Sequence, residues 1–160
     1  MDPNDIKSGQ CCAGAAAQLA AKALLETGGK ILLLQSSLCN VGKGALKARD
    51  KGNLYYTKNE KNLFVAQDRF YEDMARQCAD SAISFDLFVC ANSYVDVATS
   101  GALANRTGGQ IQLYPGFNAS KDGIALQHDL YRSRFVKTSM SCSFVAGWLG
   151  RLISTRSGRV

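Results

Sequence analysis

The stretch Gly28-Gly-Lys-Ile-Leu-Leu-Leu-Gln-Ser-Ser-Leu38 decides the fold of this chain. Residues 31–34 form a short apolar run between two glycines and a small polar cluster, a pattern typical of a strand buried on both faces. A strand of that kind needs helices above and below it. The stretch therefore predicts a layered domain in which a sheet lies between helices.

Helical and strand-like patterns alternate along the rest of the chain. Residues 10–27 are rich in alanine, place Ala15, Leu19 and Ala23 on one helical face, and end at glycines favoured after a helix. Periodicity predicts four more elements: a helix over 67–81 with Phe70, Met74, Ala75 and Cys78 inward, strands over 83–90 and 110–114, and a helix over 124–136 with Ile124, Leu126, Leu130 and Phe135 inward. This alternation predicts the α/β class with a mainly parallel sheet.

The composition is that of one globular domain. The chain has 160 residues, of which 46% are apolar and 20% charged. It contains no uninterrupted apolar run of about 18 residues, and its first residues lack the basic and then apolar pattern of a signal peptide. We expect a cytoplasmic protein.

The net charge of +6 comes from the end of the chain. All 13 acidic residues lie at or before Asp129, so the body is neutral, and the excess positive charge belongs to Arg132, Arg134, Lys137, Arg151, Arg156 and Arg159. A basic tail can contact phosphates, but no aromatic platform or known nucleic-acid module accompanies it. We therefore expect no nucleic-acid partner and keep a basic-tailed nucleic-acid or membrane-surface binder as an alternative.

No residue pattern indicates catalytic, cofactor or metal chemistry. The six cysteines show no Cys-x-x-Cys pair or zinc spacing and are expected to be mainly buried and reduced: Cys11, Cys12, Cys39, Cys78, Cys90 and Cys142. Gly42-Lys43-Gly44 lacks the rest of a phosphate-loop motif, and His128, the only histidine, has no nucleophile motif beside it. Asp86 lies inside an apolar strand, where we expect a hydrogen-bonded structural role. A small α/β enzyme of unknown reaction is a second alternative.

Five motifs in order resemble the trunk domain of the Sec-twenty-four (SEC24) family, the cargo-adaptor subunit of the COPII vesicle coat. Besides the opening stretch they are Val41-Gly-Lys-Gly-Ala-Leu-Lys-Ala-Arg49, Asp68-Arg-Phe-Tyr-Glu-Asp-Met-Ala-Arg-Gln-Cys78, Ile83-Ser-Phe-Asp-Leu-Phe88 with Tyr94-Val-Asp-Val-Ala98, and Thr107-Gly-Gly-Gln-Ile-Gln-Leu-Tyr-Pro-Gly-Phe117. The glutamine and serine after the first strand favour this subunit over its partner, the GTPase-activating SEC23 subunit. The resemblance covers residues 8–132.

The resemblance implies a von Willebrand A-like fold, of which the chain would hold only the second half. Its strands would be the fourth, fifth and sixth of that sheet, without the first strand, the metal-dependent adhesion motif, the family's zinc finger or the domains that follow the trunk. We therefore expect no cofactor and no metal. The family's partners would be the SEC23 subunit and cargo export signals, but no cargo-binding residue can be carried over, because Arg134 and Val136 do not match the family at the end of its export-signal pocket.

The sequence departs from the family after about residue 133. We divide the chain into a flexible entry (1–9), a partial trunk domain (10–137) and a divergent basic tail (138–160), and expect a truncated or frame-shifted product. The alternative is a divergent end that packs Phe144, Val145, Trp148 and Leu149 on the sheet. Because the family's first strand would be missing, one edge of the strand at 30–35 would be unpaired. We then expect the chain to be aggregation-prone or loosely folded, and Leu33→Lys to raise its solubility.

The function expected from the resemblance is protein binding rather than catalysis. The chain would act as a COPII coat component in protein transport from the endoplasmic reticulum to the Golgi. It would be cytoplasmic and would associate peripherally with membranes at exit sites and on COPII vesicles. The cargo and the residues of the partner interface are not indicated by any motif.

Overall fold

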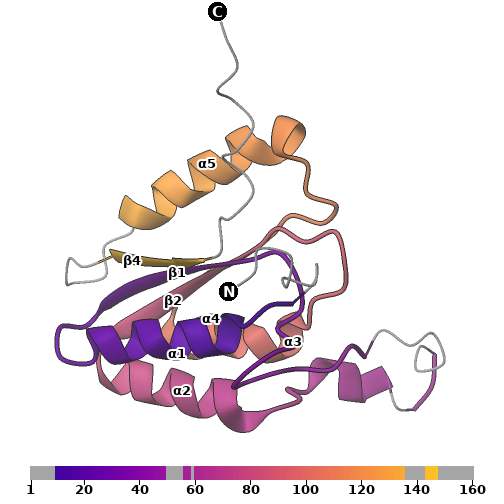
Figure 1. Cartoon of the computed structure of the whole chain (residues 1–160), viewed down its shortest axis with the longest axis horizontal. Helices are drawn as coiled ribbons and strands as arrows, with labels where there is room; N and C mark the ends of the chain where they lie inside the picture. Colours follow the sequence, from indigo (N-terminus) through magenta and orange to yellow (C-terminus); the bar gives the residue numbers. More distant parts are fainter. Residues whose placement is uncertain (1–9, 50–55, 59, 136–142, 148–160) are drawn as a thin grey trace, which may run out of the picture.

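The computed structural model of the chain describes residues 10–49, 56–58, 60–135 and 143–147 (Figure 1). In chain order its elements are α1 (Ala13–Leu24), β1 (Gly29–Gln35), the 3-10 helix η2 (Glu60–Phe64), α2 (Arg69–Asp80), β2 (Ile83–Val89), α3 (Val97–Ser100), α4 (Ala102–Thr107), β3 (Ile111–Leu113), α5 (Ala119–Phe135) and β4 (Ser143–Gly147). The three strands predicted from the sequence are present close to their predicted bounds.

The sheet has four parallel strands in the order β3-β2-β1-β4. Strand β1 lies inside it, and β2 pairs along its whole length from Gly29 opposite Ile83 to Gln35 opposite Val89. All seven residues of β2 are buried, as expected of a parallel strand covered on both faces. The predicted α/β class with a parallel sheet between helices is confirmed.

The second neighbour of β1 is β4, which the sequence analysis did not predict as a strand. It pairs in register from Lys30 opposite Ser143 to Leu34 opposite Gly147. The prediction of an unpaired β1 edge is therefore wrong, because five residues of the segment set apart as a tail form a strand along that edge. The pairing agrees with the alternative that this segment lies on the sheet, since Phe144 and Val145 are opposite Ile31 and Leu32 in the register, while Trp148 and Leu149 lie outside the described residues.

Helices cover both faces of the sheet. Figure 1 shows α1, α2 and α4 on one side and α5 on the other. Side chains alternate along each strand, so Ile31, Leu33 and Phe85 join the main apolar core with α1, α2 and α4. Lys30 and Asp86 belong to the opposite face, which α5 covers.

Helix α1 packs through small side chains rather than through the face predicted. Its buried residues are Gly14, Ala17, Ala20, Ala21 and Leu24, whereas Leu19 is 69% exposed and Ala23 is exposed. Alanine on every side of this helix makes the apolar face ambiguous in the sequence. The stripe that lies on the sheet is the one whose small residues allow the closest approach.

Helix α2 has the predicted apolar face with one exchange. Met74, Ala75 and Cys78 are buried, but Tyr71 is buried more completely than Phe70. The helix begins at Arg69, two residues after the predicted start, because the Asp68 carboxylate caps it by accepting a hydrogen bond from the Phe70 amide.

Helix α5 begins at Ala119, five residues before the predicted start at residue 124. The Asn118 side chain accepts a hydrogen bond from the Ser120 amide, and the Asn118 amide donates to the Asp122 carboxylate at 2.9 Å, which together cap the helix. Ile124 is 81% exposed, so its predicted inward position is wrong, whereas Leu126 and Leu130 are half-buried as expected. The side chain of Phe135 lies outside the part of the chain that is described.

Candidate functional site

A buried polar cluster joins the sheet to α5. The Asp86 carboxylate accepts from the Lys30 ammonium at 2.6 Å, from the Gln110 amide at 2.9 Å and from the Ser133 hydroxyl. The same ammonium donates to the Ser133 carbonyl at 3.2 Å. Every strong acceptor and donor in the cluster therefore has a partner, as a buried ion pair requires.

This cluster is closed to substrates. Asp86 is 1% exposed and Ser133 4%, so the carboxylate and the hydroxyl have no open surface at which a reacting group could sit. The expected structural role of Asp86 agrees with this geometry. The sequence analysis did not identify Lys30. A lysine in one apolar strand and an aspartate in the next are a signal that could have found it, because the two buried charges can neutralise each other.

A second polar cluster holds the long connection between β1 and α2. The Arg49 guanidinium contacts the Asp96 carboxylate at 2.7 Å and donates to the carbonyls of Asn62 and Val65 at 2.7 and 2.9 Å. The side-chain amide of Gln67 also donates to the Asp96 carboxylate, at 2.7 Å. Arg49 thereby satisfies carbonyl groups at the end of η2 and ties them to the helix that Asp96 caps.

The segment that Arg49 fixes presents apolar side chains to solvent. We define residues 60–67 as the η2 loop; in it Phe64 is 79% and Val65 61% exposed. Figure 1 shows this segment, in magenta, projecting to one side of the sheet and helix layers. A loop held by charge-assisted hydrogen bonds while it exposes neighbouring large apolar residues is typical of a protein contact surface. The sequence analysis singled out no residue of this loop as functional.

The Gly42-Lys43-Gly44 turn serves packing rather than phosphate binding. Gly42 and Gly44 have φ angles of +79° and +76°, and a Cβ on Gly44 would come within 2.6 Å of the Phe70 ring. The Gly44 carbonyl accepts the Tyr71 hydroxyl at 2.7 Å, and the Lys43 ammonium lies 5.6 Å from the centre of the Phe70 ring. The turn is thus bound to α2 through its backbone and its lysine.

His128 lies on the polar side of α5, as expected, with its side chain 73% exposed. Its neighbour Asp129 accepts the Tyr114 hydroxyl at 2.6 Å, and this hydrogen bond, helped by Arg132, holds the pKa of Asp129 below its ordinary value. Burial and the same carboxylate raise the pKa of Tyr114. The interaction fastens the end of β3 to α5 and includes no nucleophile.

The cysteines in the described part of the chain carry no sign of reactivity. Cys39 and Cys78 are buried, Cys11 and Cys90 are half-buried, and Cys12 is exposed, while Cys142 lies outside the described residues. Burial raises the pKa of Cys11, Cys90 and Cys78, that of Cys78 to about 11, so these thiols stay protonated at neutral pH. Within the described residues no three possible ligands gather as a metal site, and no helix is long and apolar enough to cross a membrane.

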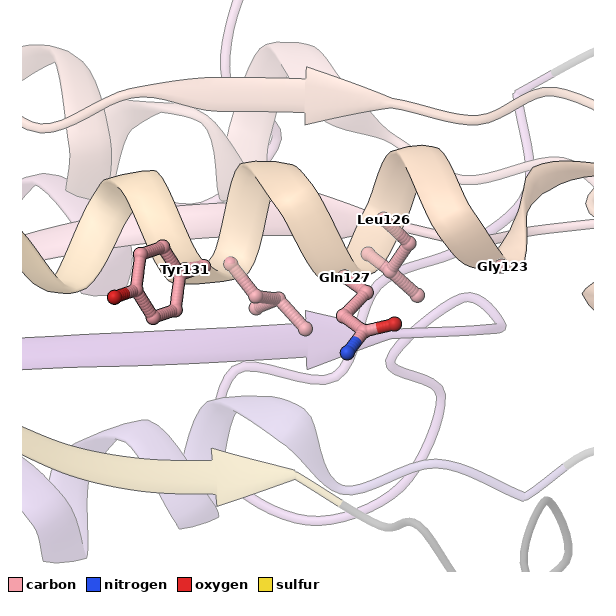
Figure 2. Close-up of a pocket in the computed structure, with 5 residues that line it drawn as sticks. Gly123, Leu126, Gln127 and Tyr131 are labelled. Carbon is pink, nitrogen blue, oxygen red and sulfur yellow. The ribbon is translucent and has the colours of Figure 1, made fainter.

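An open groove of about 370 Å³ runs along α5. Its lining residues, which we call the α5 groove, are Gly123, Leu126, Gln127, Leu130 and Tyr131. Figure 2 shows the labelled side chains along one side of the helix, with the Gln127 amide and the Tyr131 ring about one turn apart. The groove offers apolar surface and one amide, which suits a peptide or side chain better than a reacting substrate.

Comparison with known proteins agrees with the fold. The family described as the Sec23/Sec24 trunk domain matches residues 2–134. Protein transport protein SEC24 A of Arabidopsis thaliana is 41% identical over 74% of this chain, and the SEC24 protein of Chaetomium globosum is 34% identical over 91%. The crystal structure of the human COPII-coat protein Sec24c superimposes with a TM-score of 0.74 and 34% identity over 80% of this chain.

The matched region is a small part of each relative. The chain covers 12% of the Arabidopsis protein, 15% of the Chaetomium protein and 18% of the human Sec24c chain. Within that part, the family match includes the β1, α2, β2 and β3 segments around which the structure is built. The chain belongs to the Sec23/Sec24 trunk-domain family, and the members it resembles are the SEC24 proteins.

Proposed function

We propose that the chain is the trunk part of a SEC24-type cargo adaptor and acts in a COPII coat by binding proteins. The family match carries the proposal, since residues 2–134 follow the trunk pattern and the relatives are named as transport and coat proteins. The described residues support binding over catalysis. Their buried charged side chains, Lys30, Asp86 and Asp96, are paired in structural clusters, and their half-buried thiols are held protonated.

The expected partners are a SEC23-family coat subunit and the export signals of cargo proteins. The chain would then work at the cytoplasmic side of endoplasmic reticulum exit sites and associate with membranes through the coat. The proposal assigns no metal or cofactor to this role. Transport from the endoplasmic reticulum to the Golgi is the process served.

The η2 loop is the surface we assign to a coat partner. Phe64 and Val65 are exposed side by side, and Arg49 holds the carbonyls around them at 2.7 and 2.9 Å. A pre-ordered loop loses little conformational entropy on binding, which favours affinity. Large apolar residues that lie together on such a loop are the usual source of interface energy.

Capture on an immobilised SEC23-family subunit tests the proposal. We expect the intact chain to be retained at moderate salt and the double variant Phe64→Ser, Val65→Ser to bind about tenfold more weakly, as for interface hot spots. The matched control is Ile124→Ser, because Ile124 is 81% exposed on α5, away from the loop. Retention of the double variant equal to that of the control would remove the η2 loop from the interface, and failure of the intact chain to bind would contradict the coat role.

The same experiment also tests whether the basic end of the chain binds nucleic acid or an anionic membrane. Attraction to nucleic acid or to an anionic membrane falls steeply with salt, whereas an apolar protein interface does not. Capture of labelled DNA or anionic vesicles that disappears between low and moderate salt, together with no SEC23 binding, would favour that mode. A substrate turnover lost on Cys90→Ala or His128→Ala would instead favour an enzyme.

A further inference from the structure

The η2 loop turns one side of its short helix to solvent. Along η2 the exposure follows a period of three residues, with Glu60 and Leu63 half-buried. Lys61 and Phe64 are exposed. Residues three apart lie above one another in a 3-10 helix, so the Lys61 side chain is on the same side as that of Phe64. Val65 follows directly and is also exposed, so a lysine borders the apolar side chains of the loop.

Two more exposed lysines lie at the ends of the η2 loop. Lys58 belongs to the turn that leads into η2, which the Glu60 amide closes by donating to the Thr57 carbonyl at 3.1 Å. At the other end, the Gln67 side chain donates to the Lys47 carbonyl at 2.6 Å and accepts from the Lys47 amide at 3.1 Å. These contacts fix the two lysines beside the loop. The three exposed lysines that border the loop form what we call the basic rim: Lys47, Lys58 and Lys61.

The basic rim outnumbers the acidic groups of this region. Glu60 is the only acidic residue in the sequence from 56 to 67, and its carboxylate accepts a hydrogen bond from the Tyr56 amide at 3.2 Å. Asp96 is buried and is paired with Arg49 at 2.7 Å, so it does not offset the lysines. The surface that a partner meets is therefore apolar at its centre and positively charged around it.

We propose that the η2 loop binds an acidic protein surface, in which an apolar depression takes Phe64 and Val65 and aspartate or glutamate side chains face the basic rim. This inference rests on the proposed coat role and adds the chemistry of the contact. Opposite charges around an apolar centre speed encounter and fix the orientation, while the apolar contact sets the lifetime of the complex. A protein is favoured over a lipid surface because Arg49 holds the loop in one shape, which raises affinity only for a partner of complementary shape.

Rate constants for binding to an immobilised SEC23-family subunit test the inference. The rim variant Lys58→Glu, Lys61→Glu should associate about tenfold more slowly at low salt, with little change in its dissociation rate. The difference should disappear toward about 0.5 M salt, where exposed charges are screened within a few ångströms. The apolar variant Phe64→Ser, Val65→Ser should instead act mainly by speeding dissociation.

A control with the same change in net charge separates the rim from the charge of the whole chain. Lys22→Glu, Lys121→Glu replaces exposed lysines of α1 and α5, and should slow association much less than the rim variant. All variants should keep the circular dichroism of the intact chain. Equal association rates of the rim and control variants would overturn this inference and leave the coat role standing.

Two other outcomes would also contradict an acidic protein partner. Association of the intact chain that becomes faster with salt would mean that the partner surface is basic. Binding to phosphatidylserine vesicles that is lost in the rim variant, with no binding to the SEC23-family subunit, would mean that the loop meets a lipid surface. That second result would overturn both this inference and the coat role.

Discussion

Lys30 and Asp86 form the buried ion pair whose disruption should lower the stability of the chain most. The two charged groups are 2.6 Å apart, with side chains 9% and 1% exposed. Asp86→Ala would leave the Lys30 charge buried without its partner, and we expect the free energy of unfolding to fall by about 3 to 5 kcal/mol. Urea unfolding followed by circular dichroism measures this difference.

An exposed pair on α2 provides the control for that experiment. Asp73 and Arg76 lie 3.4 Å apart, with side chains 63% and 65% exposed, so Asp73→Ala should change stability by less than about 1 kcal/mol. Equal effects of the two substitutions would show that Asp86 is not in the buried cluster. Replacing both Lys30 and Asp86 by apolar residues should recover part of the loss.

Tyr114 and Asp129 should give the chain a specific dependence on pH. Their hydrogen bond holds the pKa of Asp129 below its ordinary value, so its contribution to stability is present above about pH 4 and is lost as the pH falls through the lowered pKa. Because the pKa of Tyr114 is raised, the stabilisation by the same hydrogen bond is also lost at high pH. The loss begins near pH 10, where the tyrosine of the unfolded chain ionises.

Tyr114→Phe tests this dependence. Near neutral pH we expect the variant to be less stable by about 1 kcal/mol, the usual net value of such a hydrogen bond. The difference between the two proteins should shrink as the pH falls below about 4. A difference that stays constant from pH 3 to pH 7 would mean that Asp129 is not the acceptor.

At the scale of elements, the turn at Gly44 fixes how the connection after β1 meets α2. Gly44 has a φ of +76°, and a Cβ there would approach the Phe70 ring to 2.6 Å. Gly108, after α4, has a similar φ of +71° but no atom within 4 Å of its Cβ position. Alanine at Gly108 should cost about 1 to 2 kcal/mol from backbone strain alone.

Gly44→Ala should therefore destabilise the chain more than Gly108→Ala does. Both carry the same backbone strain, but only the first must also displace the Phe70 ring. Thermal unfolding of the two variants compares them under one condition. Equal midpoints would mean that the Phe70 ring moves aside freely and that the glycine at 44 is needed for φ alone.

The sequence was sufficient for the elements whose pattern had one solution. The apolar runs of β1 and β2, bounded by glycines and polar residues, could only be buried strands, and Asp86 in such a strand had to be paired. The prediction of the buried face of α1 was wrong because alanine lies on nearly every side of that helix. The contacts of Arg49 could not be predicted, because they join residues brought together only by the fold.

Strand β4 was missed for a different reason. Its sequence, Ser143-Phe-Val-Ala-Gly147, is short and falls in a segment without resemblance to the family, so nothing local distinguished it from a tail. Its place depends on the unfilled edge of β1, which is a property of the sheet. The earlier expectation for Leu33→Lys also changes: Leu33 is 2% exposed in the main core, so this substitution should destabilise the chain and not improve its solubility.

At the scale of the whole molecule, β4 decides whether the apolar strand β1 is an edge. A chain that ends at Phe135 would leave residues 31–34 with one unpaired side and no charge or proline to block another strand. We expect that shortened chain to self-associate and the intact chain to stay monomeric, as measured by light scattering over a range of concentrations. Monomeric behaviour of both would show that β4 is not needed to cover this edge.

Amide hydrogen exchange along β1 tests the central claim that this trunk-type sheet is completed by the chain's own strand β4. With β2 on one side and β4 on the other, all the amides of residues 31–34 should exchange as slowly as those of residues 85–88 in β2, and residues 143–147 should also be protected. Fast exchange at alternate amides of residues 31–34, together with unprotected amides at 143–147, would contradict the account.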